Sequence, residues 1–298
     1  MSSKQVVLIT GSSTGFGRLF TETLARKGYT VFASMRDPQG KNAKNAADLL
    51  ALAERESLAI HTVELDVTSE PSVENAVRSV IASAGRIDVA INNAGYPIVG
   101  LTETVTTEQS QQIFDTNFFG ALRVNRAVLP HMRHQRSGVL MHISSGAGRV
   151  VFPAFGLYCA SKYAMEAAAE AYRYELAGQG IESVIVEPGA YETPILGKFV
   201  AGADAERADT YGPVAKLPEL LSTALAKSAG NAQEVADAVL RILETPAGQR
   251  KLRYRVSPSD IGVDAINEVS DRVQAGILKA FGLADITTFT RQKAVATD

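Results

Sequence analysis

The sequence predicts an α/β fold built on a doubly wound parallel sheet of about seven strands, with helices on both faces. Short apolar runs rich in β-branched residues alternate with longer helical patterns along the chain, which is the rhythm of strand–helix–strand units. Strands that are apolar throughout must be covered on both sides, so the alternation predicts a layered domain. The predicted strands are residues 6–9, 30–33, 60–65, 89–91, 138–143, 181–187 and 252–256.

Composition and charge narrow the classes of partner. The 298 residues are 46% hydrophobic, and 30 basic against 32 acidic side chains give a formal net charge of −2. This content supplies a full core but no basic excess that would attract nucleic acid or an anionic membrane surface. No apolar run has the length of a transmembrane helix. We therefore expect a small-molecule partner, no nucleic acid and no membrane.

The organisation of the chain predicts a single domain over residues 1–298. No linker rich in Pro, Gly or Ser and no internal repeat divides the sequence. Cys159 is the single cysteine, and the N-terminus lacks the basic and apolar segments of a signal peptide. Both features favour a cytoplasmic location.

Two segments depart from the alternation of strands and helices. Residues 190–230 form a long, glycine-containing connection after the sixth strand, which suits a mobile flap over a substrate site. Residues 257–298 form a C-terminal extension, within which apolar residues recur at helical spacing between positions 259 and 281. That spacing predicts an amphipathic helix that docks on this chain or on a sister subunit.

The first chemical signal is a glycine-rich turn between the first strand and the helical run 18–27. The turn reads Thr-Gly-Ser-Ser-Thr-Gly-Phe-Gly over residues 10–17. Glycines let the backbone approach a pyrophosphate, which the free N–H groups and dipole of a helix N-terminus then hold. Ordinary turns also use glycine, but the position between strand and helix favours a dinucleotide and a Rossmann fold. The residues expected at the cofactor are Gly11, Ser13, Thr14, Gly15, Phe16 and Gly17.

The end of the second strand carries the signal for the type of cofactor. Met35 and Arg36 stand where an acidic residue would bind the ribose 2′-hydroxyl of NAD. An arginine can accept the 2′-phosphate of NADP instead, so we expect NADP, with NAD less favoured. A small shift in register would bring Asp37 to this position, and Arg36 could also be a solvated charge at the strand end.

Tyr158 and Lys162 form a candidate acid/base pair. They stand four residues apart in a helix-forming sequence and so lie on one helical face. A nearby cation favours the ionised form of a phenol, whose ordinary pKa of about 10 is too high for a base at neutral pH. Taken alone, the pair is more typical of an amphipathic surface helix, so its meaning depends on the other motifs.

Taken in order, the motifs from residue 5 to about residue 195 resemble the ordinary-length short-chain dehydrogenase/reductase family, and within it steroid and retinoid dehydrogenases. The glycine turn is followed by Asp66-Val67, Asn92-Asn-Ala-Gly95, Asn117, Ile143-Ser-Ser145, Tyr158-x-x-x-Lys162 and Pro188-Gly189 with Thr193. The resemblance implies an enzyme that interconverts a carbonyl and an alcohol with NAD(P). It also implies a homodimer or homotetramer.

The resemblance assigns roles to single residues. Tyr158 would be the general acid in carbonyl reduction and the general base in alcohol oxidation. Lys162 would bind the nicotinamide ribose and lower the tyrosine pKa. Ser145 would bind the substrate oxygen, while Ser144 on the other face of the strand would be structural. Asn117 would hold a water in a proton relay, the alternative being a helix-surface amide. Further cofactor contacts would come from Asp66, Val67, Asn93, Pro188, Gly189, Tyr191 and Thr193.

The expected substrate pocket is mainly apolar, which favours a small hydrophobic ketone, aldehyde or secondary alcohol. Tyr191 stands where the family has a small aliphatic residue, so its phenol could narrow the pocket. The expected lining is Val151, Phe152, Pro153, Tyr191, Ile195, Leu196 and Phe199.

Two other functions share some of these motifs. A non-catalytic NADP-sensing regulator would keep the fold, but such proteins usually lack the tyrosine or the lysine. A sugar-nucleotide epimerase shares Tyr-x-x-x-Lys, but the residues after 195 are too few for its larger substrate domain.

The remaining conspicuous residues are expected to have packing or surface roles. Cys159 and the four histidines show no spacing typical of a metal site. Small side chains on the helix that contains Tyr158 suit close packing, either across a dimer interface or on the chain's own helices. The residues concerned are His61, His131, His134 and His142, and Ala160, Ala164, Ala167, Ala168 and Ala171.

Overall fold

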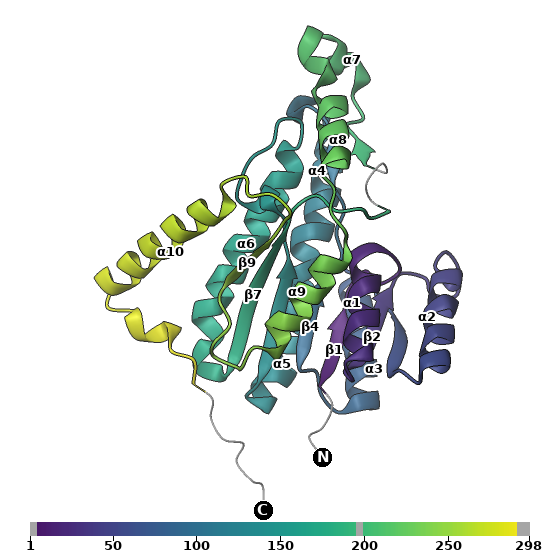
Figure 1. Ribbon diagram of the computed structural model, residues 1–298, viewed down its shortest axis with the longest axis vertical. Helices are drawn as coiled ribbons and strands as arrows, with labels where there is room; N and C mark the ends of the chain where they lie inside the picture. The colour runs from purple at the N-terminus through teal and green to yellow at the C-terminus, as the bar shows by residue number, and fades with distance from the viewer. Residues whose placement is uncertain (1–4, 195–198, 291–298) are drawn as a thin grey trace, which may run out of the picture.

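The computed structural model describes residues 5–194 and 199–290, and Figure 1 shows a parallel sheet between two layers of helices. The seven strands lie in the order β3-β2-β1-β4-β6-β7-β9, which confirms the predicted doubly wound Rossmann fold. Their limits differ from the predicted ones by no more than two residues. The strands are β1 (Val6–Ile9), β2 (Thr30–Met35), β3 (Ile60–Glu64), β4 (Val89–Asn92), β6 (Gly138–Ile143), β7 (Ile181–Pro188) and β9 (Arg253–Val256).

The strands are apolar throughout because each face of the sheet packs on its own layer of helices. In β1, Val7 and Ile9 belong to one hydrophobic core, and Val6 and Leu8 to the other, since successive side chains of a strand point to opposite faces. The first face is covered by α1 (Gly15–Arg26), α2 (Ala43–Glu56) and α9 (Gln233–Glu244), and the second by α3 (Glu70–Ala84), α5 (Gly120–Gln135) and α6 (Gly156–Leu176).

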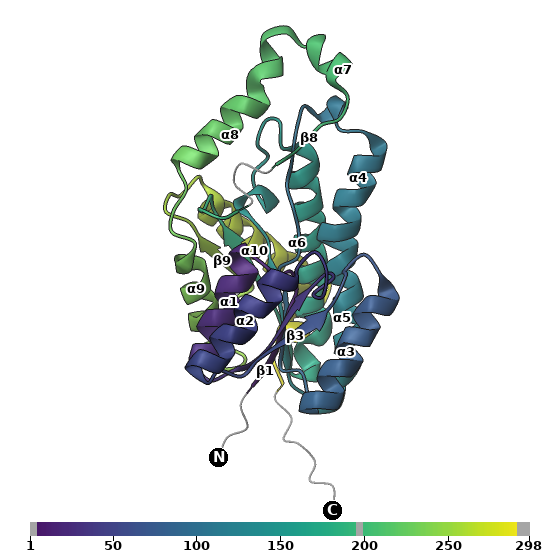
Figure 2. The same cartoon turned by 90° about the vertical axis from the view of Figure 1, so that its right-hand side faces the viewer.

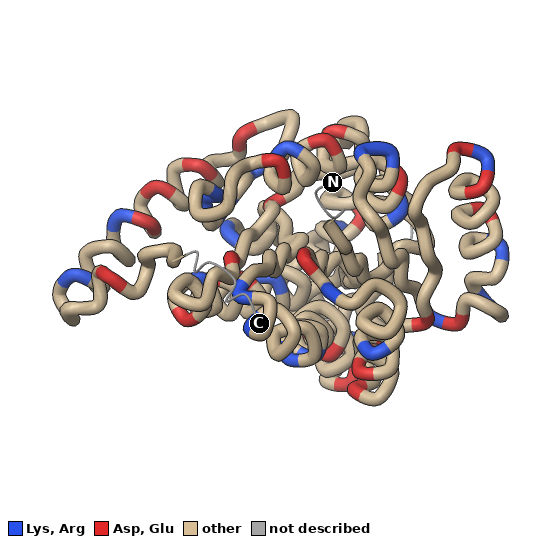
Figure 3. Tube along the Cα trace, turned by 90° about the horizontal axis from the view of Figure 1, so that it is seen from below, with Lys and Arg blue, Asp and Glu red and all other residues tan. Residues whose placement is uncertain are grey.

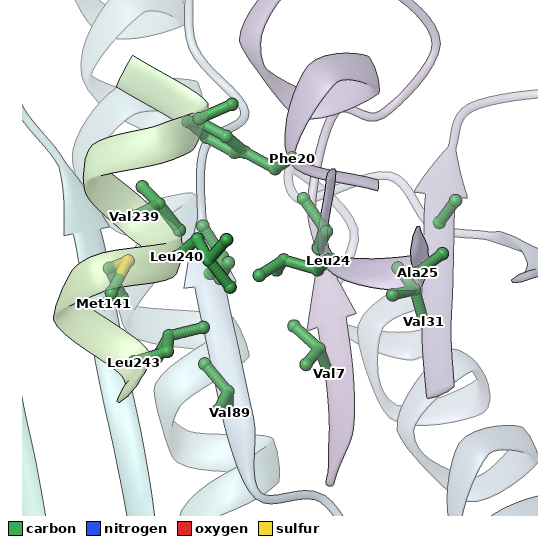
Figure 4. Packing of buried hydrophobic residues seen from close by; sticks show 14 of the residues in the cluster. Val7, Phe20, Leu24, Ala25, Val31, Val89, Met141, Val239, Leu240 and Leu243 are labelled. Atoms are coloured by element: carbon green, nitrogen blue, oxygen red, sulfur yellow. The ribbon is translucent and has the colours of Figure 1, made fainter. Parts of the chain in front are cut away.

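The first core holds α1 firmly against the sheet. Figure 4 shows Phe20 and Leu24 of α1 and Leu240 of α9 gathered over Val7 of β1. Phe20 and Leu24 have no exposed surface, and burial of such a side chain stabilises the fold by roughly 1.5–3 kcal/mol. The packing therefore fixes the helix whose first turn contains the end of the glycine-rich segment.

The direction of winding reverses between β1 and β4. From β1 the chain winds outward through β2 to β3, and it then returns to β4 on the other side of β1. In open α/β sheets, ligands bind in the crevice at the carboxyl ends of the strands at such a point. The glycine turn follows β1 here, and the segment Asn-Asn-Ala-Gly includes the end of β4.

The flap expected at residues 190–230 contains regular structure in its described part. Its far end is docked on the body, because Glu103 accepts hydrogen bonds from Arg207 Nη1 at 2.5 Å and from Tyr211 Oη at 2.7 Å. Figures 1 and 2 place this region beyond the carboxyl ends of the strands. The added elements are β8 (Val200–Ala201), which pairs with β5 (Ile98–Val99), and the helices α7 (Ala205–Asp209) and α8 (Leu217–Lys227).

The C-terminal extension contains α10 (Val263–Ala280), which projects from the body in Figure 1. Only Val263, Asn267 and Leu278 of this helix are buried. Figure 3 shows acidic and basic residues interspersed along the trace of the described chain. Within residues 5–194 and 199–290, none of the helices has the length and apolar character needed to traverse a bilayer.

Candidate active site

The glycine turn after β1 leaves little freedom for other residue types. Gly11 and Gly15 have φ angles of +69° and +57°, which favour glycine. A Cβ on Gly17 would overlap the carbonyl oxygen of Gly11 and lie 2.6 Å from Nδ2 of Asn93. Helix α1 begins without a capping bond from the Thr14 side chain and without an acidic residue in its first turn. The N–H groups at this helix end therefore suit an anion such as a pyrophosphate.

Thr10 and Asn93 join the ends of β1 and β4. The Thr10 hydroxyl accepts hydrogen bonds from the backbone N–H groups of Asn93 at 3.0 Å and Ala94 at 2.9 Å. The Asn93 side chain donates in return to the carbonyl oxygens of Thr10 at 2.8 Å and Gly11 at 3.1 Å. Asn93 thus braces the glycine turn. Sequence reasoning included Thr10 in the glycine-rich motif but assigned it no role of its own.

Two cations border the cavity beyond the end of β2. Arg36 and Lys41 line it, whereas Asp37 does not. Asp37 has a φ of 45°, and its Oδ2 accepts a hydrogen bond from the backbone N–H of Lys41 at 2.7 Å. A Cβ on Gly40 would lie 2.6 Å from Oδ1 of the same carboxylate. The carboxylate of Asp37 is therefore engaged within its own turn.

Asp66 and Val67 line the cavity after β3. Oδ1 of Asp66 accepts hydrogen bonds from the backbone N–H of Thr68 at 2.9 Å and from its hydroxyl at 2.7 Å. The backbone N–H of Asp66 donates to Oγ of Ser72 at 3.0 Å. These bonds fix the Asp66 side chain where the chain turns from β3 into α3.

Ser145, Tyr158 and Lys162 meet at the same cavity. Tyr158 and Lys162 stand one turn apart on α6, with Nζ of Lys162 5.8 Å from the centre of the Tyr158 ring. The Lys162 ammonium donates a hydrogen bond to the carbonyl oxygen of Ile143 at 2.8 Å. Oγ of Ser145 accepts a hydrogen bond from the backbone N–H of Ala147 at 3.1 Å. The predicted phenol, ammonium and hydroxyl thus come from two neighbouring elements, α6 and the end of β6.

Burial controls the ionisation of this pair. Removal from water raises the pKa of Tyr158 from 10.0 to about 12, which the Ser145 hydroxyl partly offsets. Burial lowers the pKa of Lys162 from 10.5 to about 8, which the charge of Glu166 partly offsets. The protein's own groups therefore keep the phenol protonated at pH 7. A lower pKa of Tyr158 caused by Lys162 stays a prediction for the complex with cofactor.

Asn117 lies behind the cavity and does not line it. It stands in a π-helical turn, Asp115–Phe119, and is only 1% exposed, so the alternative of a helix-surface amide is wrong. Its Oδ1 accepts a hydrogen bond from the backbone N–H of Tyr96 at 3.0 Å. Its Nδ2 donates to the Tyr96 carbonyl and to Oγ of Ser161, both at 3.0 Å. The side chain thus fixes the segment after β4 to α6, and its place in a water relay stays a prediction.

The segment after β7 borders the cavity and packs on α1 and α9. The backbone N–H of Gly189 donates to the carbonyl of Val256 at 2.8 Å. Tyr191 is 3% exposed, and its ring centre lies 5.9 Å from that of Phe16. Its hydroxyl lies 3.4 Å from Oε2 of Glu234 on α9. The hydroxyl of Tyr191 is therefore directed towards α9 rather than across the cavity.

Aromatic side chains surround Tyr158 on one side of the cavity. The ring centre of Phe155 lies 4.8 Å from that of Tyr158 and 6.0 Å from that of Phe199. Of the expected substrate residues, Phe152, Tyr191 and Phe199 line the cavity, whereas Val151 is 64% exposed and Pro153 is not in the lining. The expected contacts of Ile195 and Leu196 lie outside the described residues.

The cavity has a volume of about 570 Å³ and brings most of the predicted site residues together. Gly17, Asn117 and Pro188 are the predicted residues that do not line it. The predicted residues in the lining are Gly11, Ser13, Thr14, Gly15, Phe16, Arg36, Asp66, Val67, Asn93, Ser145, Tyr158, Lys162, Gly189, Tyr191 and Thr193. Lining residues that sequence reasoning missed include Lys41, Asn42, Tyr96, Phe155 and Leu225.

Known proteins share this arrangement over most of the chain. The family model described as short chain dehydrogenase matches residues 5–204. The uncharacterized oxidoreductase YusZ of Bacillus subtilis is 36% identical over 256 residues, which cover 85% of this chain and 89% of YusZ. Human retinol dehydrogenase 8 is 35% identical over 277 residues, covering 86% of this chain and 84% of that protein.

A solved structure that resembles this chain belongs to the same family as the model that matches its sequence. A short-chain dehydrogenase from Streptomyces avermitilis is 31% identical and superposes with a TM-score of 0.73, covering 94% of this chain and 98% of that one. The family match spans the glycine turn, Ser145, Tyr158 and Lys162. The chain therefore belongs to the short-chain dehydrogenase/reductase family, whose members are oxidoreductases that act on CH–OH groups.

Proposed function

We propose that the protein is an NADP(H)-dependent oxidoreductase that interconverts a carbonyl and an alcohol on a small hydrophobic substrate, with Tyr158 as the acid/base. The observation that carries this proposal is the single cavity lined by both the glycine turn and the side chains of Ser145, Tyr158 and Lys162. An anion site and an acid/base site that share one cavity are what a hydride-transfer enzyme requires.

Charge at the end of β2 supports NADP over NAD. A 2′-phosphate is bound by guanidinium and ammonium groups, whereas the 2′-hydroxyl of NAD is bound by a carboxylate. Arg36 and Lys41 line this part of the cavity, and the carboxylate of Asp37 already accepts a hydrogen bond from the Lys41 backbone. The available charge is therefore positive.

The residues at the cavity divide the proposed reaction between them. A bound nicotinamide supplies or takes up the hydride. The hydroxyls of Ser145 and Tyr158 orient the substrate oxygen and stabilise negative charge that develops on it. Tyr158 is protonated at pH 7, so it can donate its proton to the substrate oxygen in reduction. In oxidation the reverse step starts from the phenolate, which accepts the proton of the alcohol. The Lys162 ammonium stabilises the phenolate while the proton is away.

A second set of residues would hold the cofactor. The glycine turn suits the pyrophosphate, because its backbone N–H groups lie at the start of α1. Lys162 would bind the nicotinamide ribose. The remaining contacts would come from Arg36, Asp66, Val67, Asn93, Gly189, Tyr191 and Thr193, which all line the cavity.

The lining near Tyr158 supports a hydrophobic substrate. Phe152, Phe155, Phe199 and Leu225 contribute apolar surface there, and apolar pockets with a few polar groups select apolar ligands. A relative named as a retinol dehydrogenase acts, by its name, on retinol. We infer a carbonyl or alcohol attached to an apolar body rather than a phosphorylated sugar.

We also propose a cytoplasmic homodimer or homotetramer built from a single domain with a flap and a C-terminal extension. The sheet runs without interruption from β3 to β9, which supports one domain. Ala167 and Ala171 of α6 border a groove beside Ile266 and Val269 of α10. The small side chains of α6 and the exposed apolar residues of α10 therefore border one groove, which leaves a surface for a sister subunit.

A substrate screen tests the proposal against the alternative of an NADP-sensing regulator. NADPH oxidation and NADP reduction are followed with aliphatic, aromatic, steroid, retinoid and sugar carbonyls or alcohols, with Tyr158→Phe as the matched control. We expect turnover of apolar substrates that the control lacks. Cofactor binding with no turnover across the panel would favour the regulator, and a preference for sugars would contradict the hydrophobic substrate.

A further inference from the structure

Helix α10 is attached to the body through polar side chains as well as through the buried apolar residues Val263 and Leu278. Nδ2 of Asn267 donates a hydrogen bond to Oε2 of Glu187 at 2.7 Å. Oγ of Ser270 accepts a hydrogen bond from Nη2 of Arg149 at 2.5 Å. Positions 267 and 270 are three residues apart and so lie on the same side of the helix. An amphipathic helix is expected to dock by its apolar side, but here apolar residues such as Val273 stay exposed.

The partners of α10 belong to a buried cluster of charges around Arg253 of β9. The side chain of Arg253 is 3% exposed, and those of Glu166 and Glu187 are 2% and 0% exposed. Nε of Arg253 lies 3.2 Å from Oε2 of Glu166 and 3.7 Å from Oε1 of Glu187. Nη1 of Arg149 lies 4.0 Å from Oε2 of Glu166. Buried charges are stable only with their partners in place, so loss of one contact is expected to disturb the others.

The same cluster holds the turn that presents Ser145. Oε1 of Glu166 accepts a hydrogen bond from Oγ of Ser144 at 2.6 Å, which agrees with the structural role expected for Ser144, and Ser144 also lines the cavity. A Cβ on Gly148 would overlap the Glu166 carboxylate, so the turn is folded tightly onto it. Arg149, the partner of α10, closes this turn by donating its backbone N–H to the carbonyl of Gly146 at 3.1 Å.

We propose that Asn267 and Ser270 are positioning residues through which α10 fixes the orientation of Ser145 for the reaction. The proposal rests on the proposed function, because Ser145 is there the partner of the substrate oxygen. The path is short: Ser270 holds Arg149 at the end of the Ser145 turn, and Glu166 holds Ser144 at its start. A displacement of about 1 Å at a reacting group can lower a rate by about a hundredfold.

The test is a double-mutant cycle between α10 and the serine. The variant Asn267→Ala/Ser270→Ala is expected to lower kcat by about tenfold or more and to leave the Kd of NADPH unchanged. In a Ser145→Ala background the same pair of substitutions is expected to cause no further loss, because the group being positioned is gone. The conservative Ser270→Thr keeps the hydroxyl and is expected to retain kcat.

A control on the same helix separates positioning from general destabilisation. Glu268→Ala/Arg272→Ala removes two exposed polar side chains of α10 without changing its net charge, and kcat is expected to stay at the wild-type level. The proposal would be overturned if Asn267→Ala/Ser270→Ala lowered kcat equally in the wild-type and Ser145→Ala backgrounds. An equal loss of kcat in the control variant would overturn it as well.

Hydrogen exchange gives a readout that does not depend on turnover. Backbone amides of residues 144–149 are expected to exchange faster in Asn267→Ala/Ser270→Ala than in the wild type, and at the wild-type rate in the control. If the wild-type protein shows no turnover, the result counts against the proposed function. Hydrogen exchange at residues 144–149 then decides whether Asn267 and Ser270 position the Ser145 turn. Unchanged exchange at residues 144–149 would refute it.

Discussion

Lys162 is expected to make the protein less stable than a variant that lacks its charge. The side chain is 5% exposed, and burial lowers its pKa from 10.5 to about 8. Each pKa unit corresponds to about 1.4 kcal/mol, so the buried ammonium destabilises the folded state by about 3 kcal/mol at pH 7. Lys162→Met keeps the length of the side chain and removes this destabilising charge.

The net gain in stability from Lys162→Met is smaller than about 3 kcal/mol, because a hydrogen bond is lost. The Lys162 ammonium donates to the carbonyl of Ile143, and leaving that carbonyl without its donor costs about 1 kcal/mol. We therefore expect the variant to be about 2 kcal/mol more stable at pH 7. For a domain of this size the gain corresponds to a rise in Tm of roughly 4 °C.

The pH dependence identifies the cause. Below pH 8 the lysine is charged in both the folded and the unfolded state, so the full destabilisation is present. Between pH 8 and 10.5 the folded state loses its proton first, and the unfolded state binds more protons. Wild-type stability therefore rises relative to Lys162→Met over this range, and the advantage of the variant disappears.

Urea unfolding of the cofactor-free proteins between pH 7 and 10.5 measures this difference. Lys41→Met is the matched control, because Lys41 is exposed and its loss is expected to change the stability by less than about 0.5 kcal/mol. The reasoning would be refuted if Lys162→Met were less stable than the wild type at pH 7, or if the difference did not change with pH.

The remaining predictions concern the reaction and the cofactor. Tyr158→Phe is expected to lower kcat by at least about a hundredfold, the usual contribution of an acid/base group, with an NADPH Kd close to wild type; near-normal steady-state turnover would contradict this role. Gly17→Ala is expected to lower both the Tm and the NADPH affinity, because the new Cβ would overlap the Gly11 carbonyl. Calorimetry measures the Tm and titration measures the affinity. Wild-type values of both quantities would contradict the prediction. Arg36→Ala and Lys41→Ala are expected to weaken NADPH binding by about tenfold each, since charge-assisted hydrogen bonds contribute about 1.5–3 kcal/mol. NADH binding is expected to stay unchanged. Equal losses of affinity for both cofactors would exclude a role at the 2′-phosphate.

The parts of the fold that sequence reasoning predicted are those determined by local patterns. Val6–Ile9 is apolar at every position because both faces of the strand are buried, and that pattern is visible without a structure. The glycine turn could be placed because its position between strand and helix is local. Tyr158 and Lys162 share a helical face for the same reason.

The parts that sequence reasoning missed depend on contacts between distant residues. Lys41 lines the cavity because the Asp37 carboxylate folds the turn after β2 back on itself, and no local spacing signals this. Contacts of Glu103 with residues more than 100 positions away also join the far end of the flap to the body, and no local pattern signals them. The polar attachment of α10 likewise requires side chains from β7 and from the turn after β6.

The pKa of Lys162 depends on the buried charges that lie behind it. Glu166 stands one turn after Lys162 on α6, and its negative charge raises the pKa of that lysine against the effect of burial. The same carboxylate holds Ser144 beside Ser145. Apolar side chains in place of a buried ion network can stabilise a protein, but here they would leave the ammonium without this compensation. The pKa of Lys162 would then fall below about 8, towards the pH at which the proposed reaction needs its charge.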